Sequence, residues 1–233
     1  MTLALVLDSA VRRLCPEVAS RAEAKQPKRL SEAGLWRELA CCVLSSQVKY
    51  ETALAAAEAL VAANVFADFL SARSDSYVKH RALKVLSSPL KVQNRCMFFR
   101  FPFSKAHQLI QTRRMLLRAG VSLRDLVYQD SGERTKRRHL IALVSGFGPK
   151  QASMFLRAAG VSFDLAILDT HVLKFMALLG LAQHSELKPY LSLHRYEALE
   201  QQFERYANEV GYHLGYVDWA VWIVMRALKQ LGR

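Results

Sequence analysis

The chain has 233 residues, 52% of them hydrophobic, and a formal net charge of +13. A chain of this size can bury a proper core, in one domain or in two small lobes. Its charge predicts an anionic partner. No apolar run approaches the roughly 20 residues that a membrane-spanning helix needs, so no membrane partner is expected. The N-terminus MTLALVLDSAVRR does not resemble a secretion signal, and we expect an intracellular protein, cytoplasmic or nucleoid-associated if its source is a prokaryote.

Apolar residues recur at helical spacing along most of the chain, and no alternating strand pattern of useful length appears. This spacing predicts helices at 2–15, 31–45, 48–63, 75–86, 104–119, 134–145, 149–159, 170–180, 194–210 and 215–230. We therefore expect an all-α, two-lobed helical bundle in which residues 1–233 form one unit. One lobe is expected at about 104–185 and the remainder forms the other, with the polar stretch 20–28 as a linker or a solvated helix.

The four cysteines show no paired CxxC spacing. Cys41 and Cys42 lie in the apolar stretch 39–44, which is typical of small buried side chains. We therefore expect no metal site, neither zinc nor an iron–sulfur cluster.

Two glycines, Gly146 and Gly148, flank Phe147 in the middle of the chain. Glycines at this spacing allow a positive φ and a close approach of the backbone to a ligand, for which phosphate is the obvious candidate. Pro149 fits the first position of a helix, and apolar residues follow on one helical face. Because helical spacing also precedes the glycines, the sequence predicts a helix, a hairpin and a second helix.

Lys150 lies in the first turn of the helix that follows this hairpin. Free N–H groups and the positive end of the helix dipole disfavour an ammonium there, so a neutral, nucleophilic amine becomes easier to form. A solvated surface lysine is the alternative and the usual case. The position on the hairpin favours a reactive lysine.

Asp169 follows Lys150 by nineteen positions and stands between the apolar run 165–168 and a new helical segment. Asp is a preferred N-cap residue, so Asp169 is expected to cap that helix. Capping alone and capping combined with catalysis both remain open. A lysine on a glycine hairpin followed by this carboxylate nevertheless indicates a reaction rather than binding alone.

The segment 143–171 resembles the catalytic core of the helix-hairpin-helix DNA glycosylase superfamily. Within it, the segment is most similar to the compact 8-oxoguanine DNA glycosylase/AP lyase family typical of archaea and some bacteria. GFGPKQASMFLRAAG resembles the hairpin and following helix of that family, and AILDTHVL resembles its aspartate segment. Weaker resemblances at 44–51, 99–110 and 215–222 extend over most of the chain in the same order.

The resemblance implies a monomer that binds double-stranded DNA containing a damaged base or an abasic site in a cleft between the lobes. The target nucleotide would be flipped out of the duplex. Lys150 would attack C1′, expel the base and form a Schiff base that undergoes β-elimination, and Asp169 would take the lysine proton and stabilise positive charge on the sugar. The N–H groups of Gly146, Phe147 and Gly148 would bind phosphate, and their carbonyls a monovalent cation, with no cofactor required.

Further DNA contacts are expected outside this core. The resemblance places Gln47 where family members insert a polar side chain into the gap left by the flipped base, beside Ser46, for which helix capping is the alternative. His171 would contact phosphate or assist the cap. The basic residues Arg113, Arg114 and 136–138 are expected to contact phosphate or water.

Three residues are expected at the base pocket. Trp222 matches the tryptophan of the family's C-terminal segment and would stack on the base, or pack inward with Trp219. Asp218 accompanies it on the same predicted helix. Phe99 alternates with Phe101 and would stack on the base or cover the core.

Two departures from the family leave the identity of the excised base open. Met154 stands where relatives commonly have histidine, and the chain ends in RALKQLGR, finishing at Arg233, instead of a short tail with a terminal lysine. 8-Oxoguanine is the expected base, and another modified base is the alternative. A non-enzymatic helix-hairpin-helix module would explain the charge and the glycines, but it would leave the pairing of Lys150 with Asp169 unexplained.

Overall fold

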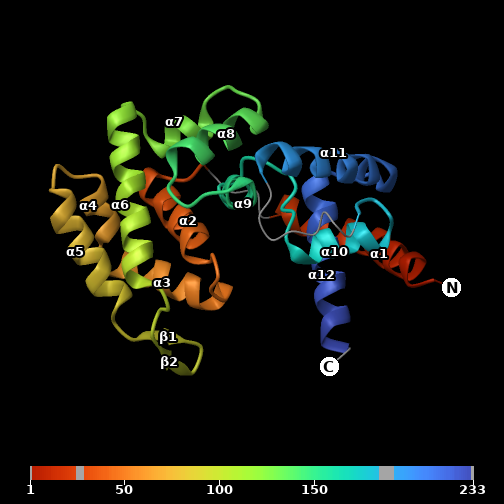
Figure 1. Ribbon diagram of the computed structural model, residues 1–233, viewed down its shortest axis with the longest axis horizontal. Helices are drawn as coiled ribbons and strands as arrows, with labels where there is room; N and C mark the ends of the chain where they lie inside the picture. The colour runs from red at the N-terminus through yellow and green to blue at the C-terminus, as the bar shows by residue number, and fades with distance from the viewer. Residues whose placement is uncertain (1, 25–28, 184–191, 232–233) are drawn as a thin grey trace. The chain divides into compact units, whose positions relative to one another are not determined.

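The computed structural model describes residues 2–24, 29–183 and 192–231, which form helices and one small sheet (Figure 1). The expected all-α class is confirmed. The chain divides into two compact units, Lys28–Val161, called here the middle unit, and Met1–Pro27 with Ser162–Arg233, called here the terminal unit. Within the described ranges, no helix is long and apolar enough to cross a membrane.

This division differs from the lobe expected at 104–185. The hairpin and Lys150 belong to the middle unit, whereas Asp169 belongs to the terminal unit. The terminal unit forms because α1 (Leu3–Ala24) packs against α12 (Leu214–Leu231), which lies at the other end of the chain. Helical spacing reports which face of a helix is apolar, but not which distant helix covers it.

The middle unit consists of α2 (Glu32–Leu44), α3 (Tyr50–Ala62), α4 (Val65–Phe69), α5 (Asp75–Leu86), β1 (Leu90–Val92), β2 (Arg95–Met97), α6 (Pro102–Ala119), α7 (Leu123–Tyr128), α8 (Glu133–Leu143) and α9 (Pro149–Ala158). Helix α2 packs against α3, α4, α6, α7 and α9. Every residue from Leu39 to Leu44 is buried, because neighbours cover α2 on several sides. The burial expected for Cys41 and Cys42 is thereby confirmed.

The terminal unit consists of α1, α10 (Thr170–Leu178), α11 (Leu193–Val210) and α12. Their apolar faces form one buried cluster, to which Phe175, Phe203 and Val217 contribute fully buried side chains. The non-helical residues before α10 supply Ala166 and Leu168 to the same cluster. The chain that leads into Asp169 is therefore part of the core of this unit.

Some elements differ from the sequence prediction. Helix α1 was expected to end at residue 15, yet it continues through Pro16 to Ala24. Proline removes one helical hydrogen bond, but the buried Val18 and Ala22 beyond it continue the apolar face and offset that loss. Of the polar stretch 20–28, the residues up to Ala24 are helical and 25–28 lie outside the described residues.

The antiparallel pair β1–β2 was not predicted, and neither were the short helices α4 and α7. The register pairs Leu90 with Met97 and Val92 with Arg95, so each strand has three residues. Strands this short contain too few alternating positions to be recognised by their pattern.

Candidate active site and DNA-binding hairpin

The turn between α8 and α9 requires a glycine at position 146. Helix α8 ends at Leu143, Val144 is extended, and the N–H of Phe147 donates to the carbonyl of Val144 at 3.2 Å. Gly146 has φ +87°, in the left-handed region that side chains disfavour. A Cβ built on Gly146 would also lie 2.6 Å from Nε2 of Gln108. The positive φ therefore favours glycine, and a larger residue would also have to displace the end of the Gln108 side chain.

Gly148 differs from Gly146. Its φ of −105° and ψ of −178° describe extended backbone, so the expected positive φ is wrong at this position. A Cβ there would lie 3.4 Å from Oε1 of Gln151, an ordinary contact. Because the protein itself does not demand glycine at 148, the bare backbone beside the first turn of α9 is available for the close approach of a ligand.

Helix α6 supports the hairpin through a row of polar side chains, called here the α6 row: Lys105, Gln108 and Thr112. The hydroxyl of Thr112 accepts from the N–H of Ser145 at 3.0 Å and donates to the carbonyl of Gln108 at 2.9 Å. The Gln108 side chain lies against Gly146. The ammonium of Lys105 donates to Oε1 of Gln108 at 3.1 Å. Helix α6 and the hairpin are therefore joined by side chains rather than by backbone pairing.

Lys105 is 7% exposed, and burial lowers its pKa. An ammonium that is buried with one amide oxygen as its hydrogen-bond partner reduces stability. Sequence analysis missed this residue. Its spacing of three and seven from Gln108 and Thr112, which places all three on one helical face, was the available signal.

Lys150 is half-buried in the first turn of α9, as predicted from Pro149. Within the described parts of the chain, the backbone N–H groups of Gly146 and Lys150 have no hydrogen-bond acceptor. Free N–H groups at a helix N-terminus attract anions, and the ammonium of Lys150 adds a positive charge. The buried thiol of Cys42 lies close enough to Lys150 for the lysine charge to oppose the rise in thiol pKa that burial causes.

Phe147 points away from this anion-binding surface. It is 7% exposed, and its ring lies with its centroid 6.0 Å from that of Phe155 on α9. The side chain therefore anchors the hairpin to the core. A DNA contact at this position would involve the backbone of Phe147 rather than its ring.

Asp169 caps α10, as predicted. One carboxylate oxygen, Oδ1, accepts from the N–H groups of His171 at 2.8 Å and Val172 at 2.9 Å. No donor among the described residues is bonded to the other oxygen, Oδ2. Asp169 is half-buried, so the cap leaves one carboxylate oxygen that can act on a ligand.

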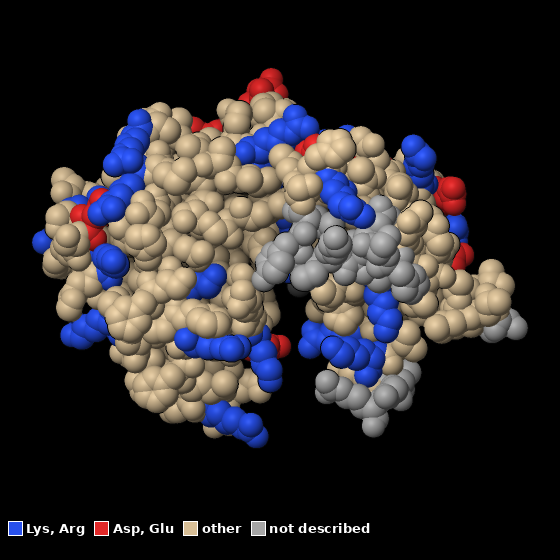
Figure 2. Space-filling view, viewed as in Figure 1, with Lys and Arg blue, Asp and Glu red and all other residues tan. Residues whose placement is uncertain are grey.

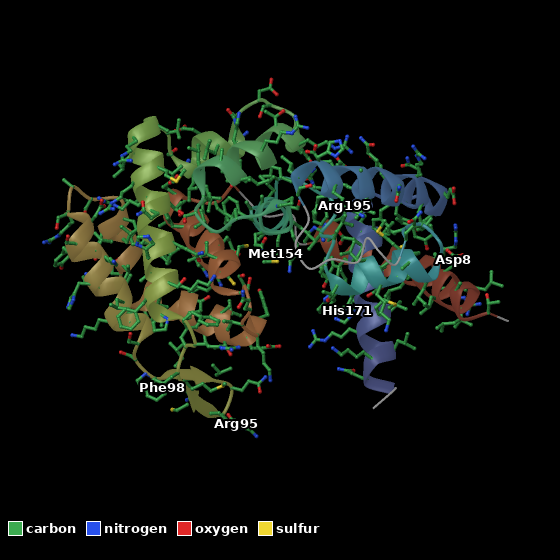
Figure 3. All side chains as sticks on the ribbon, in the orientation of Figure 1. Asp8, Arg95, Phe98, Met154, His171 and Arg195 are labelled. Atoms are coloured by element: carbon green, nitrogen blue, oxygen red, sulfur yellow. The ribbon has the colours of Figure 1, made fainter. Side chains whose placement is uncertain are left out.

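His171 and Met154 lie in the first turn of α10 and within α9, respectively (Figure 3). Both are half-buried. The backbone N–H of His171 participates in the Asp169 cap. A phosphate contact of its imidazole remains a prediction.

The segment between α2 and α3 contains an unusual backbone conformation. Gln47 has φ +63° although it is not glycine, and it is exposed. Such strain persists where surrounding structure enforces it, commonly at functional positions. The N-cap of α3 is Lys49, so the interpretation of Ser46 as a helix cap is wrong. Insertion of Gln47 into DNA, with Ser46 beside it, remains a prediction.

The residues expected at the base pocket have different environments. Trp219 packs against the core of the terminal unit, whereas Trp222 is half-buried with the guanidinium of Arg226 at 4.9 Å from its ring centroid. Asp218 is 2% exposed, and its Oδ2 accepts from the backbone N–H of Ile167 at 2.6 Å. Phe99 is 4% exposed in the middle unit. Their roles in base recognition remain predictions.

Two expected surface arginines are buried. Arg113 donates to the carbonyls of Phe69 at 3.0 Å and Ser71 at 2.9 Å, and it pairs with Asp75. Arg137 is fully buried and donates to the hydroxyl of Ser153 on α9 at 3.3 Å. The prediction of phosphate or water contacts for these two is wrong, because each guanidinium joins elements within the middle unit.

The surface nevertheless agrees with an anionic partner. Lys and Arg side chains outnumber Asp and Glu on the face shown in Figure 2. Arg95 and Phe98 lie at the β1–β2 end of the middle unit (Figure 3), where Phe98 is 70% exposed. Within the described ranges, no cluster of three or more His, Cys, Asp or Glu residues is arranged to hold a metal ion.

The sequence model of a family described as 8-oxoguanine DNA glycosylase matches residues 19–212. The chain belongs to this family. The 8-oxoguanine DNA glycosylase/AP lyase of Metallosphaera sedula is 28% identical over 211 residues, covering 90% of this chain and 91% of the relative. Its counterpart in Thermotoga sp. (strain RQ2) is 31% identical over 203 residues, covering 85% of each chain.

Solved structures of the family have the same fold. The crystal structure of the Thermotoga maritima 8-oxoguanine DNA glycosylase is 27% identical, with a TM-score of 0.66 over 94% of both chains. That of the Methanocaldococcus jannaschii 8-oxoguanine glycosylase/lyase, in complex with DNA containing 8-oxoguanine, has a TM-score of 0.69 at 20% identity, covering 93% of this chain and 95% of that one. The expected helix-hairpin-helix glycosylase fold is confirmed.

Membership of the 8-oxoguanine DNA glycosylase family gives the hairpin and Asp169 a common context. The middle unit presents an amine and free N–H groups on glycine-flanked backbone. The terminal unit presents a carboxylate with one uncommitted oxygen. An amine, free N–H groups and a carboxylate are the kinds of group that can serve as a nucleophile, an anion-binding surface and a proton acceptor.

Proposed function

We propose that this chain is a bifunctional DNA glycosylase and AP lyase that excises 8-oxoguanine from double-stranded DNA and also cleaves abasic sites. The observation that supports this most is the half-buried Lys150 in the first turn of α9, directly after a hairpin whose N–H groups lack acceptors among the described residues. A module that only binds backbone needs the N–H groups, but it does not need a lysine whose position is held by Pro149 and the hairpin.

DNA binding begins at the hairpin. The free N–H groups of Gly146 and Lys150 bind a phosphate beside the damaged nucleotide, and Gly148 lets the DNA backbone approach without a Cβ in the way. Carbonyls of the hairpin are available to a monovalent cation that bridges to the phosphate, and no other cofactor is required. The damaged nucleotide is flipped out of the duplex, and Gln47 fills the space it leaves.

The neutral amine of Lys150 then attacks C1′ of the sugar. The bond from C1′ to the base breaks, and its electron pair leaves with the base, which takes up a proton. The sugar ring opens as the bond from C1′ to O4′ breaks, and a Schiff base forms between Nζ and C1′. Loss of a proton from C2′ then expels the phosphate on C3′ by β-elimination, which cuts the strand.

Asp169 assists at two stages. Its Oδ2 accepts the proton that Lys150 loses on attack, and its negative charge stabilises the positive charge that develops on the sugar as the base departs. Its Oδ1 stays bonded to the first turn of α10, so the carboxylate keeps one orientation.

The assignment of 8-oxoguanine rests on the relatives, because the chain departs from the family at a position that bears on base recognition. Met154 stands where relatives commonly have histidine, and the departure expected at Arg233 lies outside the described residues. We place the half-buried Trp222 among the residues that contact the flipped base, whereas Phe99, which is 4% exposed, covers the core. A glycosylase for a different modified base is the second candidate, supported by the departure at Met154.

Borohydride trapping tests the proposal. Reduction of the Schiff base on duplexes with 8-oxoguanine or an abasic site should yield a covalent protein–DNA adduct with the wild type. Lys150→Gln should abolish the adduct, whereas Lys79→Gln, which removes an exposed lysine of α5 in the same unit, should retain it. An adduct that persists in Lys150→Gln would refute Lys150 as the nucleophile, and no adduct despite tight binding would favour the non-enzymatic module.

The base is tested separately. Release of free base should be measured from matched duplexes with 8-oxoguanine, an alkylated purine and an undamaged guanine. Release of 8-oxoguanine well above the others supports the assignment. Preferential release of the alkylated purine, with trapping on abasic DNA intact, would keep the lyase and change its substrate. The same duplexes with each opposite base would show the pairing preference.

A further inference from the structure

A run of three peptide N–H groups directly before Asp169 is bonded to side chains instead of to other backbone groups. These residues, 166–168, are not helical; Ala166 and Leu168 belong to the core of the terminal unit, and Ile167 between them is half-buried. Buried N–H groups need acceptors. Here the acceptors come from helices α11 and α12, which follow much later in the chain.

Helix α11 supplies two of these acceptors. Oε1 of Glu200 accepts from the N–H of Ala166 at 3.0 Å, and the hydroxyl of Tyr196 accepts from the N–H of Leu168 at 3.0 Å. The same Tyr196 hydroxyl donates to the carbonyl of Ala166 at 2.7 Å. One tyrosine therefore bridges two peptide groups of the segment. Glu200 and Tyr196 are 0% and 1% exposed.

Helix α12 supplies the third acceptor. Oδ2 of Asp218 accepts from the N–H of Ile167 at 2.6 Å, and Asp218 is 2% exposed. We call Tyr196, Glu200 and Asp218 the buried clamp. Two of its three members are carboxylic acids, which are rarely this buried because taking a charge out of water is costly. A buried acid that accepts from a backbone N–H therefore indicates that this stretch of backbone has to be held in a fixed position.

The clamp leads directly to Asp169. Asp169 donates its own N–H to the carbonyl of Ile167 at 2.8 Å, and its carbonyl accepts from Leu173 in the first turn of α10 at 2.9 Å. Its Oδ1 is bonded within the same turn. The backbone of Asp169 is thus fixed on one side by α10 and on the other by the peptide group between Ile167 and Leu168, whose N–H is bonded to Tyr196. Because the backbone and Oδ1 are both held, the direction of Oδ2 is fixed as well.

We propose that Tyr196, Glu200 and Asp218 are positioning residues for Asp169, which hold its Oδ2 where the reaction needs it. This rests on the proposed role of Asp169 in the glycosylase and lyase steps. It moves Asp218 from the base pocket to a role behind the carboxylate. The clamp residues do not touch DNA, so their substitution slows the chemical step and leaves DNA binding unchanged.

Tyr196→Phe is the mildest test, since it removes one oxygen and leaves the ring in the core. We expect the single-turnover rate of strand cleavage at saturating enzyme to fall about five- to tenfold, with unchanged Kd for a duplex containing a stable abasic-site analogue. Tyr206→Phe is the matched control. Tyr206 is a buried tyrosine of the same helix, but its hydroxyl donates to Asp8 of α1 at 2.8 Å. The control should lose comparable thermal stability and keep its cleavage rate.

Asp218 allows a rescue test. Asp218→Leu removes the acceptor for Ile167 and should reduce the rate at least as much as Tyr196→Phe. Asp218→Asn keeps a side-chain oxygen for that N–H and should restore most of the lost rate. Equal loss in both variants, or a loss of DNA affinity instead of rate, would overturn the positioning role. If Asp218→Leu does not fold, Tyr196→Phe with its control decides alone.

A double-mutant cycle separates this inference from the proposed function. If the clamp acts through Asp169, Tyr196→Phe should add less than about a twofold loss in the background of Asp169→Asn. Independent, multiplicative losses would overturn the inference and leave the role of Asp169 intact. If Asp169→Asn alone leaves the rate unchanged, the proposed function fails at that residue before the clamp is tested.

Discussion

The hairpin of the middle unit and the segment that leads to Asp169 in the terminal unit use their backbone N–H groups in opposite ways. The hairpin leaves backbone N–H groups without acceptors among the described residues and contains glycines. The segment 166–168 bonds each of its three N–H groups to a buried side chain. The N–H groups of the hairpin are available to a ligand, whereas those of residues 166–168 are all bonded within the protein, next to the carboxylate of Asp169. The proposed binding surface and the proposed catalytic group therefore place different demands on the same kind of peptide group.

The largest effect on the rate of strand cleavage is expected at Asp169, in the terminal unit. Asp169→Asn should slow strand cleavage by at least about tenfold, because an amide cannot accept the lysine proton or offset positive charge on the sugar. Asn is as good an N-cap as Asp, so α10 and the thermal midpoint should be almost unaffected. Single-turnover cleavage and a thermal melt measure the two effects.

Asp164→Asn is the control for Asp169→Asn, since it removes an exposed carboxylate of the same unit. It should leave the cleavage rate unchanged. Equal loss of stability and rate in Asp169→Asn would show that the residue only caps the helix.

The two glycines of the hairpin should respond differently to alanine. Gly146→Ala should lower the free energy of unfolding by about 1–3 kcal/mol, because it forces a Cβ into a positive φ and against Gln108. Gly148→Ala should leave the free energy of unfolding nearly unchanged and weaken DNA binding, because its Cβ points to where DNA approaches. Denaturant titration and a binding isotherm at fixed salt separate the two. Unchanged affinity in Gly148→Ala would contradict close approach at that residue.

Lys105→Met tests the part of the α6 row that lies next to the hairpin. Removing a buried ammonium should raise the free energy of unfolding by about 1 kcal/mol at neutral pH. Burial lowers the pKa of Lys105 in the folded protein below its ordinary value of 10.5, so the unfolded chain binds more protons between the two pKa values. Wild-type stability should therefore gain a contribution as the pH rises through that window, and Lys105→Met should lack it. A drop in stability would show that the ammonium is well paired.

The smallest effect is expected at Asp75. Burial of Asp75 opposes its ionisation, but hydrogen bonds from Arg114 and Arg113 outweigh burial and lower its pKa. The stability from this group is present above the ordinary pKa near 3.8 and is lost as the pH falls through the lower, folded value. Asp75→Asn should lose stability at pH 7 and show a weaker dependence on acid. Thermal melts of the wild type and the variant from pH 7 to pH 2 measure this difference in stability.

The sequence predicted the parts of the site that depend on local spacing. Pro149 predicted that Lys150 lies in the first turn of a helix, and the apolar run before Asp169 predicted that Asp169 lies at the start of one. Both are observed. The burial of Arg113 and Arg137 was missed because helical spacing does not report the acceptors that other parts of the chain bring to a basic residue, the carbonyls of Phe69 and Ser71 for Arg113 and the hydroxyl of Ser153 for Arg137. The clamp was missed for the same reason, since Tyr196 and Glu200 meet residues 166–168 only after folding.

Thiol burial has a consequence for an enzyme that repairs oxidised DNA. Thiolates, not thiols, are the forms that oxidants attack. Burial raises the pKa of Cys15 and of Cys41 to about 11, and that of Cys42, beside Lys150, well above its usual value. These sulfurs therefore stay protonated and inert at neutral pH, and Cys96 on β2 is the exposed one. Oxidants should therefore react first with Cys96 at the surface and spare the thiol beside Lys150.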